Sequence, residues 1–190
     1  MEITRDKIAE AAIVILNRDG IGGLSMRVLA RELNIKASSL YWHIKSKRDL
    51  YDIVAEKISS GMKIACSMKD ARGYLVQTAA LYREKLLKVR DSVEIFTQSA
   101  PVTPERLEII KNCIVCLLHL GVGEKDCVIA SNMFNNYVLA FVADEMRWAS
   151  FANTENPFSS ILGVNLEIMS GDEQFLRGLD VLFEGFKILK

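Results

Sequence analysis

The sequence predicts an all-α fold in which a short N-terminal unit of three helices precedes a longer helical domain. Apolar residues recur at spacings of three and four along most of the 190-residue chain, and no segment shows the alternation of a convincing strand. Capping residues, glycines and a proline divide this pattern into separate helices. Half of the residues are hydrophobic, which is enough for a substantial core, in one domain or in a small domain joined to a larger one.

Three short helices are predicted before residue 46. Thr4 can cap a first helix that stops before Gly20. Ser25 can cap a second helix, and Asn34, which tolerates a positive φ, follows it as a turn. A third helix starts at about Ala37. Two short helices joined by a tight turn and supported by a third form a helix-turn-helix unit.

A fourth helix is predicted to connect this unit to the rest of the chain. Ser46 and Asp49 form an S-x-x-D capping box at its start, and we expect it to continue to about Cys66. The predicted organisation is therefore a helix-turn-helix domain at residues 1–46, a connector helix at 47–66 and a larger helical domain at 67–190.

The larger domain reads as a series of longer helices. One is expected over 71–90, and a second begins at Thr103 and Pro104 and stops at Gly121. A helix over 124–150 is apolar nearly all round, which predicts burial, and 151–169 looks irregular. In the last helix, apolar residues repeat at spacings of four and three. We expect them to be exposed along one seam that, with the 124–150 helix, forms a four-helix dimer interface: Phe175, Leu179, Leu182 and Phe186.

Several functional classes find no support in the sequence. The motifs of nucleotide-binding sites, serine hydrolases and zinc proteases are missing, so we expect no catalytic residues. Cys113 and Cys116 form a C-x-x-C without a second metal-binding pair, and we expect buried free thiols, with no metal and no cofactor. The longest uncharged stretch is short for a membrane span, so we predict a cytoplasmic protein without a membrane partner.

The N-terminal unit carries a distinctive combination of charge and aromatic residues. Residues 1–48 have nine Lys and Arg against five Asp and Glu, whereas the remainder has fifteen against nineteen. The third helix places Trp42 on the side opposite Leu40 and Ile44, and a basic stretch follows it. Such a face suits the major groove of DNA. The alternative is that Tyr41 and Trp42 are core residues and that the cations only keep the surface soluble.

The first fifty residues resemble the tetracycline-repressor (TetR) family of bacterial transcription factors. The resemblance rests on Gly20-Ile21-x-x-Leu24-Ser25-x-Arg27-x-Leu29-Ala30-x-x-Leu33 and on Leu40-Tyr41-Trp42-His43-Ile44-x-x-Lys47-Arg48-x-Leu50. The second motif is closest in form to the tetracycline repressors themselves. The resemblance implies an all-helical homodimer whose N-terminal heads bind a palindromic operator in double-stranded DNA and whose C-terminal domains bind a small-molecule effector.

Carried over by position, the resemblance implies a set of DNA-contacting residues around the third helix. Ala37 stands where tetracycline repressors have a glutamine that reads a base, so we expect a different operator sequence. The residues expected at the DNA are Arg27, Ala37, Ser38, Ser39, Tyr41, Trp42, His43, Lys45 and Lys47.

The resemblance also identifies positions for the effector. Tetracycline repressors bind their drug through a magnesium ion held by a histidine, and Phe96 stands at that histidine's place and cannot ligate a metal. Lys63, Thr78 and Cys113 replace other drug-contacting residues, whereas Tyr82 keeps an aromatic ring. We therefore expect an apolar or amphipathic effector, bound without a metal. The expected lining is Lys63, Thr78, Tyr82, Phe96, Cys113, Met133 and Tyr137.

The leading hypothesis is thus a ligand-responsive transcriptional regulator of the repressor type. Two other classes compete with it: an enzyme, which the missing motifs disfavour, and a helical interaction module that docks through its last helix without binding DNA.

Overall fold

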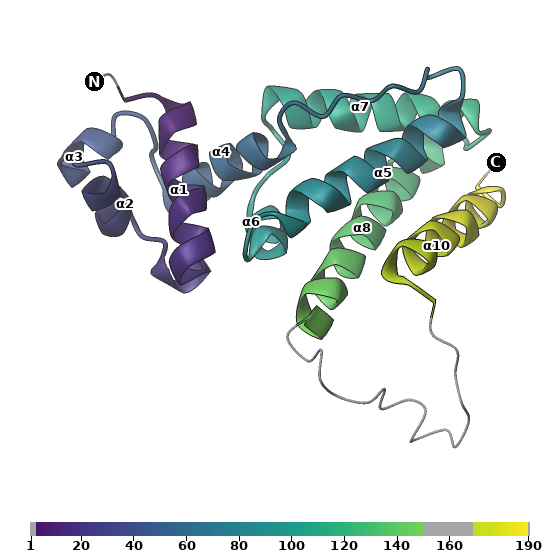
Figure 1. Cartoon of the computed structure of the whole chain (residues 1–190). Coiled ribbons are helices and arrows are strands. Elements are labelled where there is room, and N and C mark those ends of the chain that lie inside the picture. Colours follow the sequence, from purple (N-terminus) through teal and green to yellow (C-terminus); the bar gives the residue numbers. More distant parts are fainter. Residues whose placement is uncertain (1–2, 150–168, 190) are drawn as a thin grey trace.

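The computed structural model describes residues 3–149 and 169–189, and within these ranges every regular element is a helix. Figure 1 shows a small N-terminal head, formed by the first three helices, joined by a single helix to a larger helical body. No described helix has the length and apolar character that crossing a membrane would require. The predicted irregular segment at 151–169 lies almost wholly outside the described residues.

The helices follow one another in the order that the sequence predicts, with additional short elements between them. In the head and its connection to the body they are α1 (Arg5–Asp19), η1 (Ile21–Gly23), α2 (Met26–Glu32), α3 (Ala37–Leu40) and α4 (Lys47–Ser59). In the body they are α5 (Ala71–Leu87), α6 (Ser92–Gln98), α7 (Pro104–His119), η2 (Glu124–Asp126), α8 (Cys127–Ala149) and α10 (Gly171–Phe186).

The predicted helix starts are confirmed by their hydrogen bonds. The hydroxyl of Thr4 accepts from the backbone N–H of Lys7, and that of Ser25 accepts from Val28, each at 3.2 Å. At the start of α4, Ser46 Oγ accepts from the Asp49 N–H at 3.1 Å. These side chains satisfy N–H groups that a helix leaves unpaired at its first turn, which is why the sequence signals were reliable.

The connector α4 is shorter than predicted, because it ends at Ser59 and not near Cys66. Ser60 has an extended backbone, with a ψ of 149°, which ends the helix, and Gly61 follows with a φ of 67°, a left-handed conformation that glycine adopts without strain. The amide oxygen of Gln77 then accepts hydrogen bonds from the N–H groups of Ala65 and Cys66, both at 2.9 Å. Residues 62–67 therefore run irregularly along α5.

The helix predicted over 71–90 ends three residues early, and a second, short helix follows it. α5 ends at Leu87, and Asp91 has a φ of 56°, which turns the chain before α6 begins. The Ser92 hydroxyl donates to the Leu86 carbonyl at 2.8 Å and thus satisfies a group at the end of α5. The sequence did not predict α6, which packs against α4 and carries Phe96 into the body.

The last helix corrects the predicted dimer seam. Phe175, Leu179 and Phe186 are buried within the single chain, and Leu182 is partly buried. Phe175 lies against Tyr137 of α8, with ring centroids 5.6 Å apart. The heptad-like spacing therefore describes packing of α10 on α8 inside the chain, and the prediction that this seam is exposed is wrong. The apolar side chains of α10 that do face solvent are Leu176 and Val181.

Two carboxylates of α4 hold the turn between α6 and α7. Asp52 Oδ1 accepts from the Ala100 N–H at 2.7 Å. Glu56 accepts from the Thr103 hydroxyl and, through Oε1, from the Glu105 N–H at 3.0 Å. Glu56 thus caps the first turn of α7 from another helix, a role that the Thr103 hydroxyl does not fill. Through these bonds the helix that supports the head is tied to the body.

The four cysteines are free thiols. Cys113, Cys116 and Cys127 are buried and Cys66 is half-buried. Burial raises the pKa of the Cys113 thiol to about 12, which keeps it protonated and chemically inert at neutral pH.

Replacing Glu56 with Ala should destabilise the protein by about 1–2 kcal/mol, because the first turn of α7 loses its cap and Thr103 loses an acceptor. Chemical denaturation at one fixed protein concentration measures this. Lys125→Ala, an exposed change in η2, is the control and should change stability by less than about 0.5 kcal/mol. Equal stability of the two variants would contradict the capping role.

Candidate nucleic-acid interface and ligand pocket

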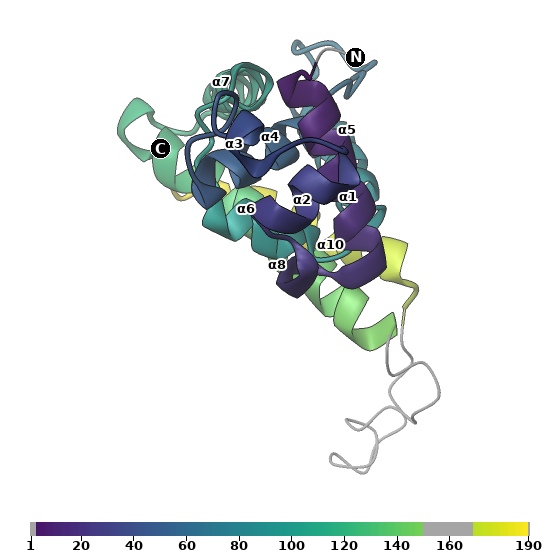
Figure 2. The ribbon, with the colours of Figure 1, turned by 90° about the vertical axis from the view of Figure 1, so that its left-hand side faces the viewer.

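The head positions α2 and α3 as a compact pair. Asn34, with a φ of 53°, turns the chain between them, and the Ile35 N–H donates to the Ala30 carbonyl at 2.9 Å. Leu40 and Ile44 are completely buried and fix the segment against the head core. Figure 1 places α3 at the end of the molecule that is farthest from the body, and Figure 2 shows α2 and α3 on the side that faces the viewer.

The side chains opposite this buried stripe face solvent. Trp42 is 82% exposed and Tyr41 is 50% exposed. The alternative that these aromatics belong to the core is therefore wrong. Two consecutive exposed aromatic rings form an apolar patch of the kind that marks a candidate interaction surface.

The cations near α3 differ from those elsewhere in the head. Arg5, Arg18 and Lys57 form ion pairs with head carboxylates. Six others lack a carboxylate partner within ion-pair distance among the described residues: Arg27, Arg31, Lys36, Lys45, Lys47 and Arg48. Because their charges are not neutralised by the protein, they create a positive surface around the exposed aromatics.

The residues predicted to contact DNA lie on or beside this surface. Ser39 and His43 are half-buried. Lys45 Nζ donates to the Tyr41 carbonyl at 3.0 Å, and Lys47 Nζ lies 5.4 Å from the centre of the Tyr51 ring. The remaining members of the predicted set are exposed: Arg27, Ala37, Ser38, Tyr41, Trp42, Lys45 and Lys47. The six uncompensated cations and the two aromatics define what we call the basic-aromatic face.

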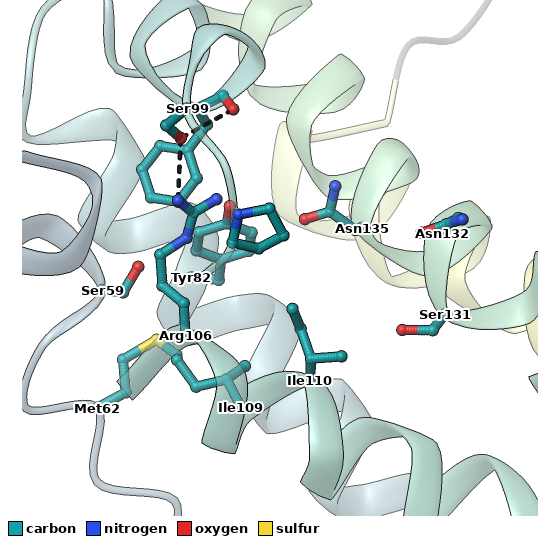
Figure 3. A pocket seen from close by; sticks show the side chains of 12 residues that line it. Ser59, Met62, Tyr82, Ser99, Arg106, Ile109, Ile110, Ser131, Asn132 and Asn135 are labelled. Atoms are coloured by element: carbon teal, nitrogen blue, oxygen red, sulfur yellow. Dashed lines mark hydrogen bonds between the residues drawn. The ribbon is translucent and has the colours of Figure 1, made fainter. Parts of the chain in front are cut away.

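A cavity of about 190 Å³ lies in the body between α4, α5, α6, α7 and α8. Tyr82 and Phe96 line it, as predicted, with ring centroids 5.3 Å apart. Figure 3 shows Arg106 reaching across the cavity toward Ser99, with Ile109 and Ile110 on the same helix. The other lining residues are Ser59, Met62, Pro101, Ser131, Asn132 and Asn135.

Arg106 is a buried, charged lining residue of the cavity that the sequence reasoning missed. Its side chain is only 9% exposed, and Nη1 donates to Ser99 Oγ at 2.9 Å and to the Ala100 carbonyl at 2.8 Å. The guanidinium carbon lies 4.9 Å from the centre of the Phe96 ring. Burial lowers the pKa of Arg106, but an arginine remains a cation. One sequence signal was present, since Arg106 lies seven residues before buried Cys113 and hence on the same face of α7.

Five of the seven predicted effector contacts lie outside this cavity. Thr78 is buried and donates to the Tyr74 carbonyl of its own helix at 2.8 Å, and Cys113 is buried in the core. Tyr137 donates to the Phe175 carbonyl at 2.7 Å, which directs it toward α10.

The other two are on the surface. Lys63 is exposed beyond the end of α4 and lines a separate groove, and Met133 is 45% exposed on α8. Of the seven predicted effector contacts, the cavity therefore brings together Tyr82 and Phe96.

The described lining does not fit a ligand held through magnesium. It contains no histidine and no carboxylate, and hydroxyl and amide groups provide its oxygens. Phe96 contributes a ring where the resemblance would require a metal ligand, and the fixed cation of Arg106 would repel a second cation nearby.

A helix-turn-helix head with a basic-aromatic face, joined to a helical body that contains a cavity, is typical of a class of transcriptional regulators. The family model described as bacterial regulatory proteins, tetR family, matches residues 8–54. The tetracyclin repressor-like C-terminal domain model matches residues 70–189. The chain belongs to the TetR family, and to its tetracycline-repressor-like type. Its members are DNA-binding transcriptional regulators and not enzymes.

Individual relatives are similar over nearly the whole chain. Tetracycline repressor protein class D of Escherichia coli is 27% identical over 98% of this chain and 90% of its own length. TetR from Acinetobacter baumannii AYE, solved as a variant in complex with minocycline, is 28% identical over 99% and 98% of the two chains, with a TM-score of 0.77. BioQ, solved with its double-stranded DNA operator, is 26% identical over 97% and 98%, with a TM-score of 0.75.

Two neighbouring substitutions should separate the exposed face from the core beneath it. Trp42→Ala should change the free energy of unfolding by less than about 0.5 kcal/mol, because the ring is exposed. Ile44→Ala should cost about 2–5 kcal/mol, because it leaves a cavity in the head core. Thermal or chemical denaturation provides the comparison, and a large loss of stability in Trp42→Ala would show that the indole serves the fold.

Proposed function

We propose that this protein represses transcription in the cytoplasm by binding a palindromic operator as a homodimer, and that a small amphipathic effector releases it. The observation that carries this proposal is the exposure of Trp42 amid cations that lack carboxylate partners, on the helix-turn-helix of a TetR-family head. A surface of this kind combines phosphate attraction with side chains that can reach base edges. The operator-bound relative and the drug-bound relative support both halves of the proposal.

Each group of residues has a distinct role at the DNA. Ser38 and Ser39 lie at the start of α3 and would face bases, whereas Ala37 offers no hydrogen bond there. Lys45, Lys47 and Arg27 would lie along the phosphates. In this proposal residues 1–46 bind DNA, residues 47–66 connect the two domains, and residues 67–190 bind the effector and form the dimer.

The homodimer would form through α8 and α10 of each subunit. Phe175, Leu179 and Phe186 are buried inside the chain, and the large apolar side chains of these two helices that remain exposed are Val128, Ile129, Met133, Trp148, Leu176 and Val181. A symmetric four-helix interface would cover them and hold the two α3 helices one DNA turn, or a near multiple, apart, where one turn is about 34 Å.

A route for the signal passes from the cavity to the head through Ala100. The Ala100 carbonyl accepts from Arg106 in the cavity, and the Ala100 N–H donates to Asp52 of α4. A ligand that displaces Arg106 or the 99–103 turn would therefore pull on α4 and change the spacing of the two heads. To switch occupancy, it must favour the released form about 100-fold or more in affinity.

Replacing Lys47 with Ala should weaken binding to all DNA sequences and lower the salt dependence of the affinity by about one unit of slope, because one phosphate contact is lost. Fluorescence anisotropy with the DNA beside the protein's own gene, over a range of salt concentrations, measures both quantities. Lys125→Ala on the body removes the same charge and should have no effect. Unchanged affinity in both Lys47→Ala and Trp42→Ala would refute the proposed interface.

Val181→Asp should produce monomers that fold normally but bind the operator weakly, because Val181 is 73% exposed on α10. Analytical ultracentrifugation at micromolar concentration and denaturation measure the two properties. Val102→Asp, at an apolar side chain that is 63% exposed before α7, should leave the dimer intact. A monomeric unaltered protein would contradict the proposed dimer, as would a Val181→Asp variant that stays dimeric.

A further inference from the structure

Arg106 places a positive charge in the cavity that the protein itself does not neutralise. The side chain is nine-tenths buried, and both of its hydrogen bonds are made by Nη1, to a hydroxyl and a carbonyl. Within residues 3–149 and 169–189, no carboxylate lies within ion-pair distance of it. A buried cation without an ionic partner is expensive for a fold, and such a group in a cavity indicates a binding site.

The two nearest candidates for an internal counter-ion are already engaged. Asp52 accepts from the Ala100 N–H, and Glu56 accepts from Thr103 and Glu105. These carboxylates favour the charged form of Arg106 from a distance, but burial outweighs them and the pKa of Arg106 is lowered. The remaining guanidinium donors, Nε and Nη2, have no acceptor among the described residues. They are available to a ligand.

The other side chains that line the cavity indicate the chemistry and the size of the rest of the ligand. Phe96 stacks below the guanidinium, and Ile109 and Ile110 add aliphatic surface. The Tyr82 hydroxyl has no hydrogen-bond partner in the described part of the chain. Burial raises the pKa of the Tyr82 phenol, so it stays neutral and can donate to an anion. At about 190 Å³, the cavity is smaller than the roughly 300–1,000 Å³ of typical drug sites.

We propose that the effector of this protein is a small aromatic organic anion, whose carboxylate binds Nε and Nη2 of Arg106 and accepts from Tyr82 while its ring packs on Phe96 and Ile110. This inference rests on the proposed function, because it names the ligand class of the same regulator. A planar carboxylate matches the paired donors of a guanidinium, and such charge-assisted bonds are stronger than neutral ones.

A purely structural role for Arg106 explains less. Holding the Ser99 hydroxyl and the Ala100 carbonyl requires a donor but not a charge, and it engages only one of the three guanidinium nitrogens. An uncharged glutamine at this position could supply one of the same bonds without the cost of burying a cation. The Phe96 ring and the distant carboxylates of Asp52 and Glu56 offset the charge only in part, and an anion in the cavity would compensate the rest.

The experiment compares acids with their uncharged amides. Isothermal calorimetry measures binding of benzoate against benzamide, and of 2-naphthoate against 2-naphthamide, to the full chain in the absence of DNA. Because each pair differs only in the charged group, the affinity ratio reports the cation in the cavity. We expect at least one acid to bind about tenfold or more tightly than its amide. The variant Arg106→Gln should reduce this ratio to below about threefold, whereas Lys111→Gln, an equal loss of charge at an exposed site on α7, should preserve it.

Equal binding of acid and amide to the unaltered protein would overturn the proposal, and so would failure of both acids to bind at millimolar concentration. Persistence of the acid preference in Arg106→Gln would do the same. The comparison on the unaltered protein stands even if Arg106→Gln does not fold. Operator binding without ligand is measured separately, so loss of DNA binding would count against the proposed function and not against the anion site.

Discussion

The structure depends on one helix that belongs to two hydrophobic cores. Leu50, Val54 and Ile58 of α4 are buried, and α4 packs on α1 in the head and on α6 and α7 in the body. A helix buried on most of its surface cannot move relative to one neighbour without disturbing the other, because close-packed interiors shift between discrete arrangements. The packing of the body therefore sets the orientation of the head. A change in the body around α4 would rotate the head and, with it, α3.

Polar contacts add to the apolar packing between α4 and the body. Asp52 and Glu56 lie on the side of α4 that faces the body, and their carboxylates accept hydrogen bonds from the N–H of Ala100 before α7 and from that of Glu105 in its first turn. On the opposite flank of the head, the Ile21 N–H donates to Asp91 Oδ2 at 2.7 Å. Gly20 is needed beside this contact: its φ is 72°, and an added Cβ would lie 2.9 Å from the same Asp91 oxygen. The head is thus tied to the body at two separated places, and a rotation that preserves one tie must strain the other.

The head was predictable from the sequence to a degree that the body was not. Its helix caps are local sequence signals at Thr4, Ser25 and Ser46, and Trp42 faces away from the buried side chains of Leu40 and Ile44. In the body, the spacing of Phe175 and Leu179 showed that one side of α10 is covered but could not show whether α8 or a second subunit covers it. The helix α6 went unnoticed because its seven residues are too few to show a helical repeat, and Arg106 resembled a surface charge because burial of a cation is decided by tertiary neighbours.

The position of Arg106 also determines how much a ligand could achieve. A ligand that touched only Phe96 and the isoleucines would gain similar contact in any arrangement of α4, and equal affinity for two states shifts neither. The Arg106 guanidinium, in contrast, is bonded to Ala100, whose N–H is held by Asp52 of α4. An anion that draws the guanidinium toward itself competes with the Ala100 carbonyl, so its binding energy differs between the arrangement in which that bond is intact and one in which it is broken. Such a difference in binding energy between the two arrangements is what shifts the protein toward release. The cavity provides it at Ala100, which bonds both to Arg106 and to Asp52 of α4.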